Sequence, residues 1–488
     1  MDSKKEINFK LIMKFISILL MILSGFMSTA VLWSWHYDES ETINSLLISI
    51  GITLLSGIFL YILSYKHNQS NIGKKEGYII VTLTWLSISF FGALPFFISG
   101  AIPSYTDAFF ETMSGFTTTG ATILNDIESV SKGLLFWRSM TQWLGGMGII
   151  VLTLAILPIL GIGGMQLFVA EAPGTTPSKL HPRITETAKR LWGIYLIFTL
   201  LQTLLLILGG LNFFDSICHA FTTMATGGFG TYNDSIAGFS AYNQYVIILF
   251  MILAGTSFSL HYYALKGTFS KLTNNEEFKF YLKLISIITI VFTASILIFE
   301  QTGFEKAFRD SLFQVVSIIT TTGFITVDYL EWKGFMWFII FLLMFTGGCI
   351  GSTGGGLKMI RVLIFLKNSR LELRRLIHPM AIVPVRINKK TIPPEIIQNF
   401  LAFQLIYLLL FIAGTLFMTV LELDFVSAIG ATAATIGNIG PGIGSVGPVE
   451  TYSHIPDIGK WILSFFMLIG RLELFTVLLL FSPSFWKK

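Results

Sequence analysis

Charged residues and cysteines are scarce in this sequence. Only 12% of the 488 residues are charged, whereas 53% are hydrophobic, and the mean hydropathy is +0.72. This composition excludes a typical soluble globular protein. The two cysteines, Cys218 and Cys349, both lie in apolar surroundings and lack zinc-ligand spacing, so we expect two buried thiols and no disulfide framework.

Motifs that carry catalysis are missing as well. The sequence has no hydrolase constellation or metal cluster, and Lys358 is followed by Met359 instead of the serine or threonine of a phosphate-binding loop. We therefore predict that the protein is not an enzyme and that no organic cofactor binds to this chain. The net charge of +5 does not gather on one soluble face, so no nucleic-acid partner is indicated.

Long apolar runs dominate the chain instead. A helix needs about 20 apolar residues to cross a bilayer, and ten runs approach or exceed that length. They predict an all-α, multi-pass membrane protein whose constant partner is the lipid bilayer. The runs cover Asn8–Trp33, Ile43–Tyr65, Gly77–Gly100, Leu134–Leu160, Leu191–Leu211, Tyr242–Tyr263, Phe278–Glu300, Gly334–Leu366, Ile396–Leu423 and Ile458–Phe481.

The basic residues between these runs sort by loop. Every second loop is basic, while the alternate loops hold almost only acidic and neutral residues. By the positive-inside rule we expect both termini in the cytoplasm. We also expect the protein in the cell inner membrane. The basic loops include Lys66, Lys74, Lys75, Lys179, Arg183, Lys266, Lys271, Lys367, Arg370, Arg374, Arg375 and Lys390.

Four shorter segments on the outer side form an internal repeat of about 100 residues. They begin at Asp107, Asp215, Asp310 and Asp424. Aligning the first three without gaps superposes Gly120, Gly228 and Gly323. In the fourth segment the match is Gly440 with about three extra residues, or Gly437 without them, and spacing alone leaves both open.

The repeat predicts four parallel units of helix, short pore helix and helix around one pore. We expect an extra transmembrane helix pair in residues 1–70, followed by pore repeats in 71–165, 166–268, 269–380 and 381–488. Each aspartate should cap its short helix, after which the chain turns through threonine and glycine. Glycine lets four strands approach closely, and rings of backbone carbonyls can replace the hydration shell of an alkali cation.

Six sequence words carry a resemblance to a known family. They are TTTGAT at 117–122, ATGGF at 225–229, TTTGF at 320–324, NIGPG at 438–442, GGCIGSTGGGLK at 347–358 and GRLELFT at 470–476. With them the chain resembles the Trk/Ktr/HKT superfamily of potassium transporters, most closely its bacterial TrkH type, over essentially its whole length.

The resemblance implies a potassium filter and favours Gly440 over Gly437 as its fourth glycine. The first filter glycine, Gly120, is often serine in relatives that prefer sodium. In the fourth strand Asn438 and Ile439 stand in place of two threonines, so we expect a less symmetric site. The implied filter residues are Thr118, Thr119, Gly120, Thr226, Gly227, Gly228, Thr321, Thr322, Gly323, Asn438, Ile439 and Gly440.

The eighth apolar run is interrupted by six glycines between residues 347 and 356. Each glycine disfavours a helix by about 1 kcal/mol, so a continuous helix is not expected here. The resemblance implies an intramembrane loop that obstructs the pore, while a simple packing kink is the alternative. The candidate gate residues are Gly347, Gly348, Gly351, Ser352, Thr353, Gly354, Gly355 and Gly356.

Two charged residues in apolar surroundings need partners or water. Resemblance places Arg471 in the pore beneath the filter, where it would raise the barrier for cations. The alternative is a structural ion pair, for example with Glu473. Glu111, in the first short segment, could draw cations to the pore mouth or bond a neighbouring backbone group.

The sequence therefore predicts potassium uptake, with potassium as transported substrate. Resemblance further implies a homodimer and a cytosolic nucleotide-binding regulatory ring of TrkA type, for which Lys367 to Lys390 is a plausible docking surface. Two alternatives stay open at this point. One is a proton- or sodium-coupled symporter, and the other is a non-conducting membrane scaffold or sensor.

Overall fold

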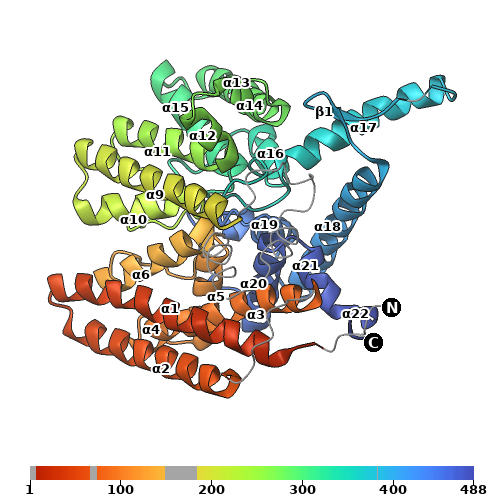
Figure 1. Ribbon diagram of the computed structural model, residues 1–488. Helices are drawn as coiled ribbons and strands as arrows, with labels where there is room; N and C mark the ends of the chain where they lie inside the picture. The colour runs from red at the N-terminus through yellow and green to blue at the C-terminus, as the bar shows by residue number, and fades with distance from the viewer. Residues whose placement is uncertain (1–6, 66–73, 149–183, 382, 488) are drawn as a thin grey trace.

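The computed structural model describes residues 7–65, 74–148, 184–381 and 383–487. Within these ranges the regular secondary structure is almost entirely helical (Figure 1). The strands described there are β1 (Arg386–Ile387) and β2 (Lys390–Thr391), which pair as one antiparallel hairpin. Six of the described helices are long and apolar enough to cross a membrane, or eight if each of two bent helix pairs counts as one span.

The chain begins with two long antiparallel helices, α1 (Phe9–His36) and α2 (Ser40–Ser64), which pack along each other. One face of α2 carries exposed apolar side chains such as Leu55 and Phe59, which suits contact with lipid. The turn between the helices presents Glu39. Its carboxylate accepts hydrogen bonds from the backbone N–H groups of Lys132 (2.5 Å) and Gly133 (3.1 Å), and so attaches the pair to the rest of the protein.

Four later spans each precede one of the four short segments in the sequence. They combine high hydropathy with few charges, and their outward faces are apolar. They are α3 (Lys74–Gly92, continued by α4, Leu94–Ile98), α9 (Ile184–Leu208), α14 (Glu276–Phe299) and α18 (Pro394–Val420).

The four short segments fold as buried helices. In α5, every residue from Ala108 to Phe116 is buried, so these helices form the centre of the molecule. Each is too short to cross a bilayer, in line with the sequence analysis. They are α5 (Tyr105–Phe116), α10 (Phe213–Met224), α15 (Phe304–Ile319) and α19 (Phe425–Ile436).

The aspartate predicted to cap each short helix does so only in α19, where Asp424 accepts a hydrogen bond from the Ser427 N–H (3.1 Å). In α5 and α10 the caps are Ser104 and Asn212, three residues earlier. The aspartates there lie in the first turn, where a carboxylate still favours the positive helix end. The third helix begins after Gly303, so its aspartate lies in the second turn. The prediction was therefore wrong in three segments. In α5 and α10 a side chain three residues before the aspartate caps the helix, and the cap position of α15, Gly303, lies seven residues before its aspartate.

The helices that follow the short segments are α6 (Lys132–Trp143, continued by a π-helical turn, η1, Leu144–Gly148, where the described residues end), α11 (Ala241–Ala254), α16 (Gly334–Leu343) and α20 (Asp457–Arg471). The last three of these helices are interrupted partway. After the breaks come α12 (Phe258–Leu265), α17 (Met359–Ile377) and α21 (Phe475–Leu478).

These breaks correct two predicted straight spans. The run Tyr242–Tyr263 is bent by 100° between α11 and α12, and the run Ile458–Phe481 is bent by 113° between α20 and α21. Close approach to a short helix accompanies the break: a Cβ on Gly470 would lie within 3.0 Å of the Ile436 carbonyl oxygen at the end of α19. The predicted run Leu134–Leu160 is described only as far as residue 148, and the predicted unit boundaries at residues 70 and 165 lie outside the described residues.

The units pack in a circle. In three of the four units, the helix after the short segment packs on the short helix of the next unit: α6 packs on α10, α11 on α15, and α20 of the last unit on α5 of the first. The remaining elements are small and peripheral: α13 (Phe269–Thr273), η2 (Gly444–Val446), η3 (Leu479–Phe481) and α22 (Pro483–Trp486). Near the C-terminus, Lys75 at the start of α3 donates to the Lys487 carbonyl (3.2 Å).

We predict that Glu39→Ala lowers the apparent Tm of the purified protein in detergent. Ser131 precedes α6 without capping it through its side chain, so Glu39 is the side chain that satisfies two of the first N–H groups of that helix. Loss of a cap costs about 1–2 kcal/mol. Glu41→Ala, at an exposed glutamate two residues later, is the control, and equal Tm shifts for both variants would contradict the assignment.

Candidate functional site

Each short helix is followed by a short non-helical segment. These four segments, called the strands of the ring from here on, share one backbone conformation. The third residue of each strand after the helix cap is a glycine with positive φ, at Gly120 (85°), Gly228 (78°), Gly323 (82°) and Gly440 (94°). The first residue after the cap is also left-handed, at Thr118 (53°), Thr226 (54°), Thr321 (59°) and Asn438 (53°). The four strands thus share one conformation despite their different sequences.

The left-handed threonines are backbone outliers. A β-branched residue with positive φ is unusual, and the left-handed region costs roughly 1–2 kcal/mol for a residue with a Cβ. The turn is held by one repeated hydrogen bond from the next residue back into the helix, as from Thr119 N–H to Ser114 O (2.8 Å) and from Thr322 N–H to Ser317 O (2.8 Å). Strain of this kind, kept at the same place in every unit, marks a functional site.

The four strands close into a ring through their glycines. A Cβ on each glycine would lie within 3.0 Å of a carbonyl oxygen of the next strand, a distance that real Cβ atoms essentially never show. Only glycine therefore allows this approach. The pairs, in order around the ring, are Gly120 with Gly227 O, Gly228 with Thr322 O, Gly323 with Ile439 O, and Gly440 with Thr119 O.

The backbone separates the two candidate glycines of the fourth unit. Gly437 is the cap residue of α19, with φ of −80°, and corresponds to Thr117 in the first unit. Gly440 has the positive φ of the other three glycines and touches the first strand. Asn438 and Ile439 occupy the places of threonines. The Asn438 amide donates to Thr119 Oγ1 (3.0 Å) and to the Met467 carbonyl (2.8 Å). A threonine hydroxyl, with a single donor hydrogen, could not make both bonds.

The glycine-rich segment lies directly beneath this ring. Between α16 and α17 it forms an irregular loop, and the loop touches three of the four units. Thr353 donates to the Met224 carbonyl at the end of α10 (3.0 Å), and the Gly355 N–H donates to Thr321 Oγ1 (2.7 Å). A Cβ on Gly356 would lie 3.1 Å from the carbonyl oxygen of Gly437. A local kink in a helix would not need contacts with three different units.

The rest of the loop is fixed from the side. Cys349 N–H donates to Gly255 O (2.8 Å), and Phe258 N–H donates to Gly351 O (3.0 Å), so the loop is bonded to the break between α11 and α12. The remaining predicted loop residues, Gly347, Gly348, Ser352 and Gly354, all lie within this stretch. Cys218 and Cys349 are both free and buried thiols, as predicted.

Arg471 joins the loop to the first unit. Its guanidinium donates to the carbonyls of Thr353 in the loop (2.7 Å) and of Gly145 and Gly146 in η1 (2.7 Å each). Among the residues that the structure describes, Glu473 does not form the ion pair with Arg471 that the sequence left open. Glu473 instead pairs with Arg361 (2.5 Å), whose side chain is 2% exposed.

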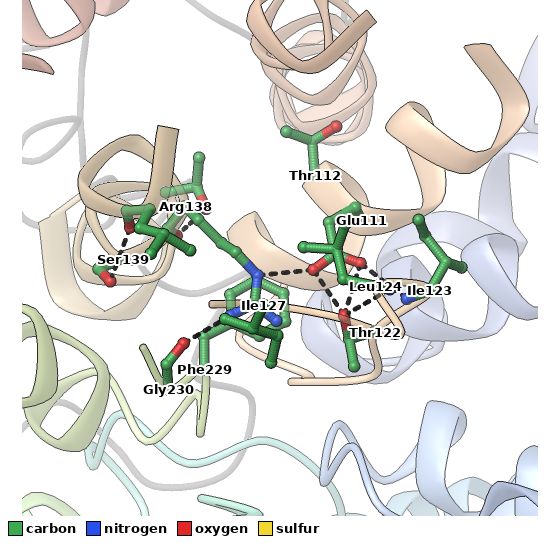
Figure 2. Close-up of polar contacts among 12 residues, drawn as sticks. Glu111, Thr112, Thr122, Ile123, Leu124, Ile127, Arg138, Ser139, Phe229 and Gly230 are labelled. Carbon is green, nitrogen blue, oxygen red and sulfur yellow. Dashed lines mark hydrogen bonds and ion pairs between the residues drawn. The ribbon is translucent and has the colours of Figure 1, made fainter. Parts of the chain in front are cut away.

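Above the ring, Glu111 and Arg138 form a buried ion pair (Figure 2). The Arg138 Nε donates to Glu111 Oε1 (2.7 Å), and the same carboxylate accepts from the Ile123 N–H (2.9 Å). Arg138 also donates to the Gly230 carbonyl (2.9 Å) and stacks on the Phe229 ring at 3.5 Å. The pair therefore ties α5 and α6 to the outgoing chains of the first two strands. Of the two expectations for Glu111, the bond to neighbouring backbone is the one found.

The comparisons with known proteins decide the family. Residues 47–488 match the model of the TrkH family, described as cation transport proteins. The chain belongs to the TrkH family. This membership confirms the prediction that the protein is a transport protein and not an enzyme.

The TrkH relatives cover the whole chain. It is 39% identical to the Trk system potassium uptake protein TrkH of Halomonas elongata, over 99% of this chain and 100% of that one. It is 38% identical to the protein of the same name from Escherichia coli K12, again over 99% and 100%. The crystal structure of the potassium transporter TrkH from Vibrio parahaemolyticus superposes with a TM-score of 0.89 at 35% identity, over 98% of this chain and 100% of that one.

The TrkH match confirms the predicted fold class, an all-α multi-pass membrane protein. Two residues of the site were missed in the sequence analysis. Arg138 and Gln142 both lie in a predicted apolar run, Leu134–Leu160, and contact strands of the next unit. For Arg138 the available signal was a charge inside an apolar run. An isolated glutamine such as Gln142 gives no sequence signal from which its partner could be predicted.

We predict that Glu111→Ala destabilises the protein by about 3–5 kcal/mol, because it leaves Arg138 buried without its carboxylate. The double variant Glu111→Met with Arg138→Met should lose less, since no buried charge remains. Thermal unfolding in detergent measures both. The control is Glu305→Ala in the more exposed Glu305–Arg309 pair (3.4 Å), which should lose less than about 1 kcal/mol. Similar losses for the buried and exposed pairs would contradict this prediction.

Proposed function

We propose that this chain takes up potassium ions through the ring of four strands. The ring carries the proposal: four units place a strained strand and a glycine at one level, each glycine against a carbonyl of the next strand. The relatives named as potassium uptake proteins support the choice of ion. Potassium is then the transported substrate, and no organic cofactor is assigned to this chain.

Backbone oxygen is suited to this task. A ring of carbonyl dipoles can replace the water shell of a potassium ion without a full charge that would hold it too tightly. Four strands from one chain bring such oxygens close together only where Cβ atoms are absent. The proposed filter comprises residues 118–120, 226–228, 321–323 and 438–440, with Gly440 as the fourth glycine.

The loop at 347–356 is proposed as the gate. It lies under the ring and is bonded to the ends of α10 and the third strand. Arg471 stabilises this closed arrangement through three carbonyls of two different units. Its positive charge beneath the filter would also oppose the passage of cations while the loop is in place.

The wider assembly is part of the same proposal. The protein would lie in the inner membrane with both termini in the cytoplasm, form a homodimer, and be regulated by a cytosolic nucleotide-binding ring of TrkA type. The relatives belong by name to a Trk system, which supports further components. Exposed basic residues of α17 and the hairpin, such as Arg370, Arg374 and Lys389, supply a docking surface. The four pore repeats would keep the boundaries 71–165, 166–268, 269–380 and 381–488.

The first test is the cation flux of purified protein in liposomes, with potassium, rubidium and sodium compared. We expect potassium and rubidium to pass well ahead of sodium. Gly120→Ser should narrow that difference by about tenfold, because a left-handed residue with a Cβ costs about 1–2 kcal/mol and 1.4 kcal/mol is a factor of ten.

The control for this test is Gly100→Ser. Gly100 has a similar positive φ (76°), but a Cβ there meets nothing within 4 Å. It should leave the flux ratio unchanged. Equal flux of the three cations in the parent would remove the filter from the proposal. No flux at all, with and without a regulatory ring, would indicate a scaffold or sensor. A reversal potential that follows a pH or sodium gradient would indicate a coupled symporter.

A second prediction concerns the gate. Arg471→Gln should raise potassium flux through the protein without its regulatory partner by about tenfold or more, because hydrogen bonds to charged groups contribute about 1.5–3 kcal/mol each. Arg375→Gln, in a half-exposed pair on α17, is the matched control and should change little. Unchanged flux in Arg471→Gln would show that the loop does not depend on this arginine.

A further inference from the structure

The second strand of the ring lacks the side chains that support its neighbours. In the first and third strands, a hydroxyl pair braces the turn: Thr117 with Thr119 (2.8 Å) and Thr320 with Thr322 (2.7 Å). The corresponding residues of the second strand are Ala225 and Gly227, which have no hydroxyl. Something else must therefore hold this strand in the shared conformation.

Gln142 supplies that support from another unit. This fully buried residue near the end of α6 donates from Nε2 to the Gly227 carbonyl (2.6 Å), and its Oε1 accepts from the Phe229 N–H (3.0 Å). The two bonds lie on either side of the filter glycine, Gly228. A side-chain amide has both a donor and an acceptor, and only one orientation of this amide satisfies both backbone groups.

The Gln142 side chain also fills the space that a side chain at position 227 would need. A Cβ on Gly227 would overlap the Gln142 amide carbon and lie 2.8 Å from its Nε2. A threonine at 227, as at the equivalent places of the first and third strands, would therefore push the Gln142 amide away from both backbone groups. The sequence ATGGF at 225–229 and the glutamine at 142 are parts of one arrangement.

We propose that Gln142 is a positioning residue for cation selectivity. This inference rests on the proposed function. Gln142 holds Gly228 at its place in the ring because it bonds the Gly227 carbonyl before that glycine and the Phe229 N–H after it. The residue touches the filter backbone and not the ion path, so its removal would loosen one wall. A more mobile second strand would discriminate less between sodium and potassium, because selectivity requires the carbonyl oxygens to be held at defined positions.

The test is the potassium-to-sodium flux ratio in liposomes for Gln142→Met, which keeps the length of the side chain and removes both hydrogen bonds. We expect the ratio to fall by roughly tenfold or more, because two buried hydrogen bonds are lost. The control is Gln244→Met. Gln244 is another buried amide and donates to the carbonyls of Ile236 (3.2 Å) and Phe239 (3.2 Å), away from the ring. It should leave the ratio unchanged.

A pair of variants keeps the inference testable if Gln142→Met does not fold. Gly227→Thr alone should lower the potassium-to-sodium flux ratio, because its side chain would displace the Gln142 amide from both backbone groups. Adding Gln142→Ala should relieve the overlap and raise the Tm, but the flux ratio should stay low, since neither hydrogen bond is present. A folded double variant with the parent's flux ratio would overturn the inference.

The two proposals fail in different ways. If the parent protein does not discriminate potassium from sodium, the proposed function fails before any variant is measured. If the parent discriminates and folded Gln142→Met keeps the parent's ratio, the filter stands and the role of Gln142 is refuted. A similar fall for Gln142→Met and Gln244→Met also refutes it, because the effect would then be general.

Discussion

The contact between a glycine of one strand and a carbonyl oxygen of the next governs this structure. Four such contacts close a ring, and none would tolerate a Cβ. The left-handed residue two positions earlier and the turn out of each short helix bring the glycine to that place. The burial of the short helices at the centre follows as well, because their ends must meet at one level.

Around this regular ring, the supporting contacts differ from unit to unit. Hydroxyl pairs brace the first and third strands, Gln142 braces the second, and Asn438 bonds the fourth to the first. The Glu111–Arg138 pair joins the first two units above the ring. A buried ion pair is favourable only when its remaining groups are satisfied, and this one has backbone partners on both sides.

The sequence predicted what depends on composition and period. Apolar length predicted ten spans, of which six to eight qualify among the described residues, and the spacing of aspartate and glycine words placed Gly120, Gly228 and Gly323 in register. The supporting residues could not be predicted in this way. Gln142 and Gly227 are 85 residues apart, and no local pattern links a glutamine in one unit to a missing hydroxyl in the next.

The bends at α11–α12 and α20–α21 were missed for a related reason. Apolar runs of 20 or more residues favour a straight helix, while each interruption lies where a short helix ends against the run: α15 of the next unit at Gly255, and α19 of the same unit at Gly470. The aspartate caps failed locally: Ser104 and Asn212 are equally good caps and lie one turn earlier. Composition therefore fixes which segments are helical, and tertiary contact fixes where they stop.

The four walls of the ring are encoded at four separate places in one chain, unlike the identical walls of a homotetramer. A single codon change therefore alters one wall, whereas in a homotetramer it alters four at once. The ring can therefore vary one strand at a time. A substitution can change the contacts that support one strand while the other three strands keep theirs, and the different supporting contacts of the four strands are an example of that independence.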